Sequence, residues 1–536
     1  MKHGRFLVAA ITLVVAFTSM PSWAELQNVE IGGEIRIRGR WWLNIWDEGA
    51  NGNRWVNRVA GGNFPARALG YDSAARIGGI WSRFEWDGRG PDYKYVEQLT
   101  ALDVAADFTD DVAAVFRLES FDIWGEDFRS NYVTGADMRA ASVDDLEFTQ
   151  AYIEASNMFG YPVRLRIGRQ LLTFGKGWLV NKTHSQSRSM PFDAVRLTYS
   201  ADKFTIDAWS SKLADTSPIE EDGDVDFYGV YGTYSRFEAL SISGYWLWVR
   251  DAVSRQHTQL TPLGEWVEDL VGVDDYDVTN LHTFGIRLFG DRDAFDYDLE
   301  LAYQFGNADS AGFIFRPFNG IYGDDDADYD NWGMETEVGY TFDAPCQPRV
   351  FVGGVYFEGE DNRDINFFEW LYFWANPFYE PDASVSFNRL FSGTSLASIF
   401  DSSQLFTNLW QIRCGVDLEP ADNVAGTFQL AYFGVVDEFD HPIYIGRDYP
   451  FLAIRPLIPI LSFWAPNDAD DIGWIATLTF KYSYSQDFSV TVGWDHFFVG
   501  DGMSEGNYTY LMGFVNTMGR DDDDADYVYF DARLRF

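Results

Sequence analysis

The last eleven residues, DYVYFDARLRF (526–536), alternate strictly between apolar and polar side chains. Side chains of a β-strand point alternately to opposite faces, so this segment predicts a strand with one apolar and one polar face. The apolar face holds Val528, Phe530, Ala532, Leu534 and Phe536, and the polar face holds Tyr527, Tyr529, Asp531, Arg533 and Arg535. A soluble sandwich and a membrane barrel can both use such a strand, so the rest of the chain must distinguish them.

The same alternation recurs along the whole chain in segments of about ten residues bounded by Gly, Asp, Asn or Pro. Clear examples are EIGGEIRIRGRWW (30–42), WIATLTFKYSY (474–484) and FSVTVGWDHFF (488–498). Aromatic residues make up 18% of the chain, and no segment shows a helical period. Many strands with an aromatic-rich face account for both observations.

Connection lengths alternate as well, and they separate the two architectures better than any single strand. Short turns are expected at 109–111, 200–203, 343–348, 419–423 and 485–487. Between them lie long Asp-rich connections at 122–144, 174–190, 252–278, 307–329, 360–406, 435–469 and 499–525. Outer-membrane barrels have short periplasmic turns and long extracellular loops, whereas a soluble sandwich has no reason to sort its loops in this way.

The sequence therefore predicts an all-β protein, a transmembrane antiparallel β-barrel with long acidic extracellular loops. With both termini periplasmic, the strand number is even. Taking 29–43 as the first strand and 94–107 as the second gives 18 strands, provided that 76–88 belongs to the first long loop. Sixteen strands is the alternative.

The first 24 residues have the pattern of a secretory signal peptide. Lys2 and Arg5 precede an apolar run at 6–17, and Ser22-Trp23-Ala24 offers a cleavage site. We expect residues 25–536 to form one barrel domain. Loss of the two basic residues takes the formal net charge from -42 to -44, which argues against a nucleic-acid partner.

Only two cysteines, Cys346 and Cys414, occur in a chain that is expected to reach an oxidising compartment. They lie far apart in the sequence, in a predicted turn and a predicted strand. We therefore expect no disulfide scaffold and no bond between them.

If the apolar side chains face lipid, a set of basic side chains points into the lumen. This set contains Arg36, Arg38, Arg40, Arg117, Arg164, Arg166, Arg196, Arg287, Arg413 and Lys481. The planar guanidinium fork suits carboxylate and phosphate groups, and rings of basic side chains can select anions. Acidic residues share the same phase, namely Glu119, Glu154, Asp207, Asp298, Glu300, Glu335, Glu337, Asp417 and Asp495. An ion-pair lattice that stiffens the wall is therefore the alternative role of these charges, and both roles can coexist.

The stretch IGRQLLTFGKGWLVNKTHSQSRSMPFDAVR (167–196) resembles a strand-loop-strand motif of the alginate-export family of outer-membrane proteins. The matching positions are Gly168, Arg169, Gln170, Phe174, Gly175, Arg188, Phe192, Asp193, Ala194, Val195 and Arg196. The chain departs from the motif at Lys176-Gly177-Trp178, where the family has Asp and Arg. The resemblance implies a wide monomeric barrel with a basic lumen that passes an anionic polysaccharide outward.

The motif adds Arg169 and Arg188 to the expected pore-lining set. Simple alternation places Arg169 on the lipid face, so its place in the pore requires a bulge or a strand end. The terminal Phe536 also resembles the assembly signal of bacterial outer-membrane proteins, which implies a barrel-assembly machinery as a partner.

We therefore predict a passive outer-membrane channel for an anionic poly- or oligosaccharide, located in the bacterial outer membrane. Expected partners are outer-membrane lipid, lipopolysaccharide, the saccharide solute and a periplasmic protein that delivers it. Alternatives are a general diffusion porin with little solute preference and a secreted all-β enzyme that degrades polysaccharide.

Signals for catalysis and cofactors are weak. The histidines have no metal-ligand spacing, and paired carboxylates are too common here to indicate glycoside chemistry. We therefore expect no enzyme activity and no cofactor. Asp324, Asp326 and Asp328 have alternate spacing, but Tyr329 stands where a calcium-binding EF-hand loop needs Gly. We expect these residues to be solvated loop tips, which divalent cations can bridge to lipopolysaccharide.

Overall fold

The computed structural model describes residues 27–43, 93–109, 111–124, 146–184, 188–215, 224–252, 278–307, 327–359, 383–384, 386–400, 406–437, 470–500, 508–510, 514–516 and 524–536. The expected signal peptide (1–24) and the segment 76–88 lie outside these ranges. The extent of the single barrel domain therefore stays a prediction. Within the described ranges, the search for an apolar helix of membrane-spanning length finds none.

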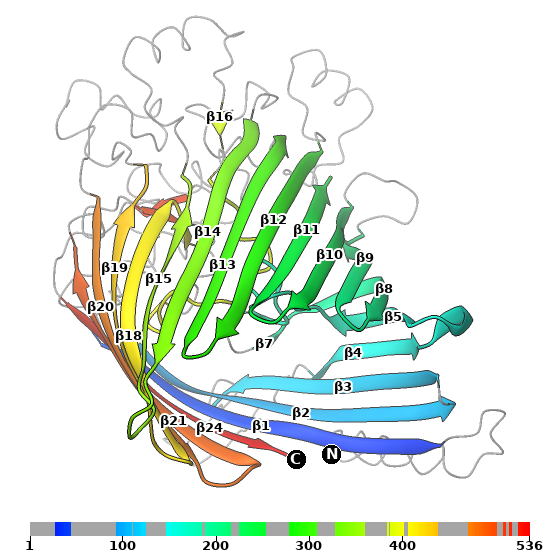
Figure 1. Ribbon diagram of the computed structural model, residues 1–536, viewed down its shortest axis with the longest axis horizontal. Coiled ribbons are helices and arrows are strands. Elements are labelled where there is room, and N and C mark those ends of the chain that lie inside the picture. Colours follow the sequence, from blue (N-terminus) through cyan, green and yellow to red (C-terminus); the bar gives the residue numbers. More distant parts are fainter. Residues whose placement is uncertain are drawn as a thin grey trace, which may run out of the picture.

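Eighteen antiparallel strands of the described residues form a closed barrel (Figure 1). In order around the wall they are β1 (Asn28–Leu43), β2 (Tyr93–Thr109), β3 (Val112–Ile123), β4 (Leu146–Ala155), β5 (Val163–Leu171), β8 (Pro191–Ala201), β9 (Phe204–Ala214), β10 (Val225–Phe237), β11 (Leu240–Asp251), β12 (Thr279–Arg292), β13 (Phe295–Asn307), β14 (Ala327–Thr341), β15 (Arg349–Phe357), β18 (Leu409–Ala421), β19 (Val424–Val435), β20 (Asp471–Ser483), β21 (Phe488–Val499) and β24 (Ala525–Arg535). Each strand pairs with its sequence neighbour in the wall, and β24 pairs with β1. The predicted fold and the count of 18 are confirmed.

Shorter elements lie in the connections. A 3-10 turn, η2 (Met158–Gly160), joins β4 to β5. The remaining short strands are β6 (Thr183–His184), β7 (Arg188–Ser189), β16 (Ala383–Ser384), β17 (Phe406–Thr407), β22 (Tyr508–Tyr510) and β23 (Phe514–Asn516). Of these, β16 adds two parallel pairs to the end of β14.

The alternation of short and long connections is confirmed. At one end of the barrel, each pair of strands is joined by a turn of a few residues, such as 202–203 between β8 and β9. At the other end, the long connections join the strand ends, and only parts of these connections belong to the described ranges. In outer-membrane barrels the short-turn end faces the periplasm.

The outer face of the barrel is apolar and carries two aromatic belts. Toward the long-loop end, the outward rings of β11 to β14 touch one another; this chain runs through Trp248, Trp246, His282, Phe284, Phe305, Tyr303 and Trp332. Near the short-turn end, exposed rings recur at Phe159, Tyr161, Phe204, Phe237, Phe295, Phe342, Tyr482, Tyr484 and Phe536. Aromatic girdles at both interfaces, separated by an apolar band, are typical of a barrel in a bilayer.

The terminal strand closes the barrel at the first. The backbone of Phe536 exchanges two hydrogen bonds with Gly33, at N···O distances of 2.9 and 3.1 Å. A Cβ atom on Gly33 would lie 2.7 Å from the Phe536 ring, so the ring covers this glycine. The outward set predicted for the last eleven residues is therefore confirmed, and the start of β1 and the end of β24 lie at the same end of the barrel (Figure 1).

Candidate functional site

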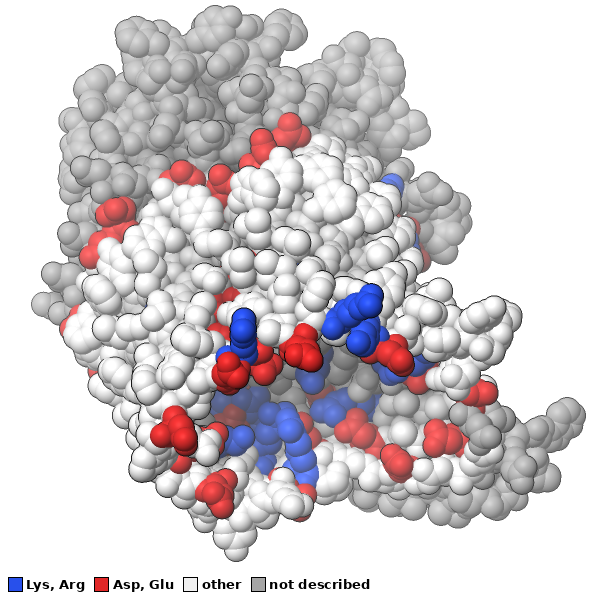
Figure 2. Space-filling model, viewed as in Figure 1, with Lys and Arg blue, Asp and Glu red and all other residues white. Residues whose placement is uncertain are grey.

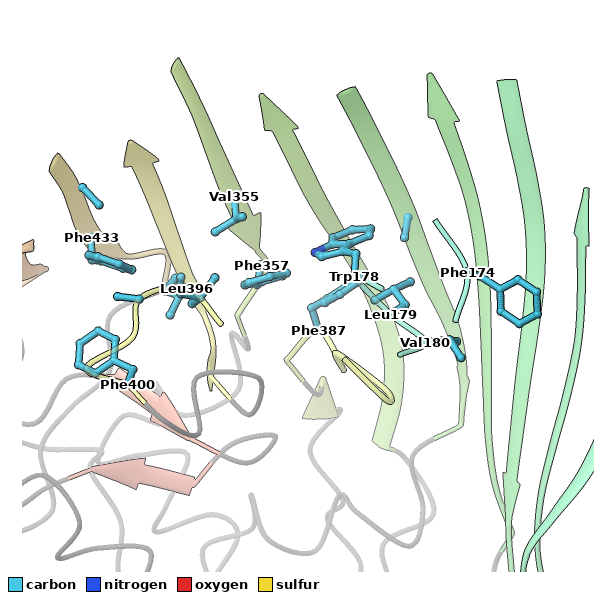
Figure 3. Close-up of a cluster of buried hydrophobic side chains, with 14 of the residues drawn as sticks. Phe174, Trp178, Leu179, Val180, Val355, Phe357, Phe387, Leu396, Phe400 and Phe433 are labelled. Atoms are coloured by element: carbon cyan, nitrogen blue, oxygen red, sulfur yellow. The ribbon is translucent and has the colours of Figure 1, made fainter. Parts of the chain in front are cut away.

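Two connecting segments, 172–184 and 386–400, fold into the barrel near its long-loop end. Trp178 is only 1% exposed, and its ring stacks on Phe357 of the wall and on Phe387 of the second segment. Phe174 stacks on the inward rings of Trp209 and Tyr231, with centroid distances of 4.4 and 5.0 Å. Figure 3 shows Trp178 beside Phe357 and Phe387, with Phe174 farther along the wall. The segments therefore narrow the lumen with a dry, packed cluster.

Polar side chains of the wall hold segment 386–400 in place. Gln304 of β13 donates to the carbonyl of Asn388 and accepts from its N–H, both at 2.7 Å. The buried carboxylate of Asp495 on β21 accepts from the N–H of Ile399 at 2.7 Å. The indole of Trp42 on β1 donates to the Ile399 carbonyl at 2.9 Å. Buried polar groups that are satisfied in this way fix a segment in one position.

The two segments also bind each other. Val180 and Phe391 form a parallel bridge, and the N–H of Phe391 donates to the carbonyl of Leu179 at 2.9 Å. The first segment bends at Gly175 and Gly177, whose φ angles of 58° and 82° favour glycine. This bend presents Lys176 to Asp298 on β13, with an N···O distance of 3.3 Å. The residues that depart from the family motif, 176–178, therefore belong to the segment that narrows the lumen.

Arg389 lies inside the second segment and is almost fully buried. Its guanidinium lies over the ring of Phe357 at 4.6 Å and donates to the carbonyl of Thr394 at 2.9 Å. Burial lowers the pKa of Arg389 to about 9, so the side chain stays charged at neutral pH. This cation links the segment to the wall by a cation–π contact.

Most of the predicted pore arginines lie on the inner face, and they are paired with acidic side chains. Arg38 pairs with Glu97, Arg36 with Asp531 and Arg287 with Asp298. Further pairs, with N···O distances, are Arg117–Asp103 (2.7 Å), Arg164–Glu154 (4.0 Å), Arg166–Glu154 (2.5 Å), Arg196–Asp207 (2.8 Å), Arg413–Glu337 (3.1 Å) and Arg40–Glu97 (3.8 Å). The alternative role of these charges, an ion-pair lattice on the wall, therefore has direct geometric support. Lys481 differs, because it is exposed and has no ion pair among the described residues.

A pocket lies between segment 386–400 and the seam where β24 meets β1. Its lining consists of Arg36, Arg38, Arg40, Ser395, Ser398, Thr491, Tyr527, Tyr529 and Asp531. The pocket thus combines guanidinium groups, hydroxyl groups and aromatic faces along one side of the lumen. Figure 2 shows basic side chains gathered inside the hollow of the molecule, with acidic side chains around its rim.

One member of the predicted pore set, Arg169, lies on the outer face of the barrel. Arg169 shares the outer face with Ile167, and its guanidinium binds both carboxylate oxygens of Asp193 on β8, at 2.8 and 2.9 Å. Its inclusion among the pore-lining residues is wrong, because β5 has no bulge here and the alternation continues unbroken. Arg188 belongs to β7, within the connection between β5 and β8, and its guanidinium lies 4.5 Å from the ring centroid of Phe121.

Other motif positions serve the wall and the constriction. Gln170, fully buried, donates to the carbonyl of Ala194 at 2.9 Å. Phe192 packs on Phe227 and Phe391. A Cβ on Gly168 would lie 2.3 Å from the carbonyl oxygen of Ala151, and its φ is 127°. The motif therefore specifies how the connection enters the barrel.

On the described wall strands, three inward arginines are absent from the predicted set, namely Arg349, Arg533 and Arg535. The last two stand on the polar face of the segment 526–536, so the alternation alone could have included them. Arg349 is the first residue of β15 and follows a turn. Too few alternating residues flank it for the sequence to show which face of the strand it occupies.

Only part of the candidate calcium-binding stretch belongs to the described residues. Asp324 and Asp326 lie outside the described residues, and Asp328 belongs to β14. Within the described ranges, no three His, Cys, Asp or Glu side chains come together as metal ligands would. Cys346 and Cys414 both carry free thiols.

Comparison with known proteins matches one family across most of the chain, and its description is alginate export, residues 85–512. Comparison with curated proteins finds no match. Among solved structures, the chain is similar to OccK8 (OprE) of Pseudomonas aeruginosa, with 11% identity, a TM-score of 0.48 and coverage of 96% of this chain and 99% of that chain. It is also similar to OccAB1 of Acinetobacter baumannii, with 11% identity, a TM-score of 0.47 and coverage of 94% and 97%.

The family match covers the motif at 167–196 and the strands on both sides of it. The closed barrel with its apolar outer face and the family match together identify a channel of the bacterial outer membrane. The chain belongs to the alginate export family.

Proposed function

We propose that this channel passes an anionic oligo- or polysaccharide by diffusion along the pocket at the seam of β1 and β24. The observation that carries this proposal is the lining of that pocket. Arg36, Arg38 and Arg40 bring three guanidinium groups to one side of the lumen, next to Tyr527 and Tyr529. Guanidinium groups suit carboxylates, and aromatic faces offer apolar contact to sugar rings.

Pairing with acids does not remove the capacity of an arginine to bind a solute. A guanidinium has five N–H donors, and one bidentate carboxylate uses two of them. Several pairs on the wall are partly exposed, such as Arg166 with Glu154. An anionic group that passes can therefore be bound by the same side chains that stabilise the wall, which lets the two proposed roles coexist.

A general diffusion porin with little solute preference is the second candidate. The ion-pair lattice favours it, because paired charges attract anions and cations less selectively than unpaired ones. A secreted enzyme is disfavoured, since the family and the fold indicate a channel. Lipid and lipopolysaccharide are proposed to contact the aromatic belts. A barrel-assembly machinery is proposed to bind the strand that ends in Phe536.

Solute preference can be measured by the swelling of proteoliposomes in isotonic saccharide solutions. We expect short oligogalacturonates to enter faster than neutral maltooligosaccharides of the same length, because the guanidinium groups attract carboxylates. Raising the ionic strength to about 1 M shortens the screening length to about 3 Å and should reduce this difference. Equal rates for the two solutes at low salt would support the general porin instead.

A further inference from the structure

The charge on the inner wall is distributed unevenly between two sectors. On β13, β14, β15 and β18, one guanidinium is shared by several acids: Arg349 lies 2.6 Å from Asp296, 2.9 Å from Glu337 and 3.1 Å from Asp417. At the seam the relation is reversed. There Glu34 is the shared acid, and its carboxylate is surrounded by three arginines.

The three arginines around Glu34 come from two strands. Arg533 lies 2.6 Å away, Arg535 3.6 Å and Arg117 3.9 Å. Arg117 has two further acids, Asp103 and Glu119, at 2.7 and 3.2 Å. Arg533 and Arg535 have only Glu34 among the ion pairs of the described residues. Arg117 is balanced by Asp103 and Glu119, and the single charge of Glu34 neutralises only one of Arg533 and Arg535.

A third cation lies close by on the same part of the wall. Lys481 of β20 is the register partner of Thr491 on β21, which is in turn the partner of Asp531 on β24. It is exposed and has no ion pair among the described residues. Arg533 is the register partner of Ser489 on β21. On the β21 side, Lys481 and Arg533 therefore stand beside small hydroxyl side chains, and Glu34 is the one acid that Arg533 and Arg535 share.

These three cations are accessible and stand at the short-turn mouth. The side chain of Arg535 is 62% exposed and that of Arg533 is 37% exposed, whereas Arg38 and Arg40 in the pocket are nearly buried. Arg533 and Arg535 lie at the end of β24, and Lys481 lies near the end of β20. The pocket with Arg36, Thr491 and Asp531 begins next to them. A solute that enters from the short-turn end meets the exposed cations first.

We propose that Lys481, Arg533 and Arg535 form an anion-capture site at the periplasmic mouth, where a carboxylated saccharide docks before it enters the pocket. This inference rests on the proposed function, and it adds the place in the channel where selection of the anionic solute begins. The acid-rich sector of β13 to β18 repels the same solute, so the docked chain is directed along the seam. Thr491 and Asp531 connect the capture site to the pocket.

Binding of a fluorescent hexagalacturonate to the folded, detergent-solubilised protein tests this site. The variant Lys481→Ser/Arg533→Ser/Arg535→Ser is expected to raise the dissociation constant at least about tenfold, equivalent to about 1.4 kcal/mol. The matched control is Lys203→Ser/Arg236→Ser/Arg292→Ser. It removes three exposed cations from the same end of the barrel without touching the seam, and its dissociation constant should stay within about twofold of wild type.

A second variant distinguishes an effect of lost positive charge from an effect of lost folding. Arg533→Lys/Arg535→Lys keeps the cations and should retain most of the binding, and gel migration with and without boiling reports the folded barrel for each variant. An unchanged dissociation constant in the triple serine variant would overturn the capture site. If wild type swells preferentially in oligogalacturonate but its binding is insensitive to these residues, the inference fails and the proposed function stands. If wild type shows neither preference nor binding, both fail.

Discussion

Replacing residues 387–399 by a short glycine-serine linker is expected to raise the single-channel conductance severalfold. These residues carry Phe387, Leu396 and Ile399, which pack inside the barrel against the wall. An 18-stranded wall encloses an aqueous channel when no loop fills it, so removing the segment opens the lumen. Conductance in planar bilayers, before and after the replacement, measures the effect.

The control deletes the same number of residues, 445–457, from the long connection between β19 and β20. Its conductance should stay close to that of wild type if the constriction lies at segment 386–400. A point variant gives a milder version of the same test. A Cβ on Gly333 would lie 2.4 Å from the Phe387 ring, so Gly333→Leu should displace this ring and increase current fluctuations. Identical conductance for the replaced segment and wild type would place the constriction elsewhere.

Gly33→Leu is expected to abolish most of the folded barrel. A Cβ at this position would lie 2.6 Å from the carbonyl oxygen of Ala101 and 2.7 Å from the Phe536 ring, so neighbouring backbone must shift at the seam of β1 and β24. Strained or overpacked positions usually cost about 1–3 kcal/mol, and here the strain falls on the pairing that closes the barrel. The fraction that migrates as folded protein without boiling measures the loss.

Gly244→Leu is the matched control, because it adds the same side chain to another strand glycine. The nearest atom to a Cβ at Gly244 is a carbonyl oxygen 4.0 Å away. Gly244 faces outward, where a leucine meets lipid. This variant should therefore fold like wild type. Normal folding of Gly33→Leu would show that the contact between Gly33 and Phe536 is dispensable for closure.

The wall of the barrel could be predicted from the sequence. Strand side chains alternate between two faces, and because one face meets lipid and the other meets the aqueous lumen, apolar and polar residues alternate with the same period of two. Every second residue from Val528 to Phe536 and from Trp474 to Tyr482 faces outward as the pattern indicates. Loop lengths then gave the orientation and the strand count. Arg169 illustrates the strength of this rule: the motif suggested the pore, but the unbroken alternation of β5 placed it outside.

The interior could be predicted only in part. Alternation shows that Arg166 and Glu154 both face inward, but their pairing depends on the register of β4 against β5, which the sequence does not specify. The sequence also does not show that the segments carrying Trp178 and Phe387 fold into the lumen. Their burial depends on Gly333 and Phe357, which are distant in sequence, and apolar residues in a loop carry no period that says where they pack.

The measurement that tests the account most directly is the reversal potential of single channels under a salt gradient. The account predicts steady conductance with a preference for anions, which Arg166→Ala or Arg196→Ala should reduce, because each removes an inward guanidinium and leaves its partner acid unpaired. A preference for cations in the wild-type channel would contradict it, since the acidic side chains of the wall would then govern the lumen.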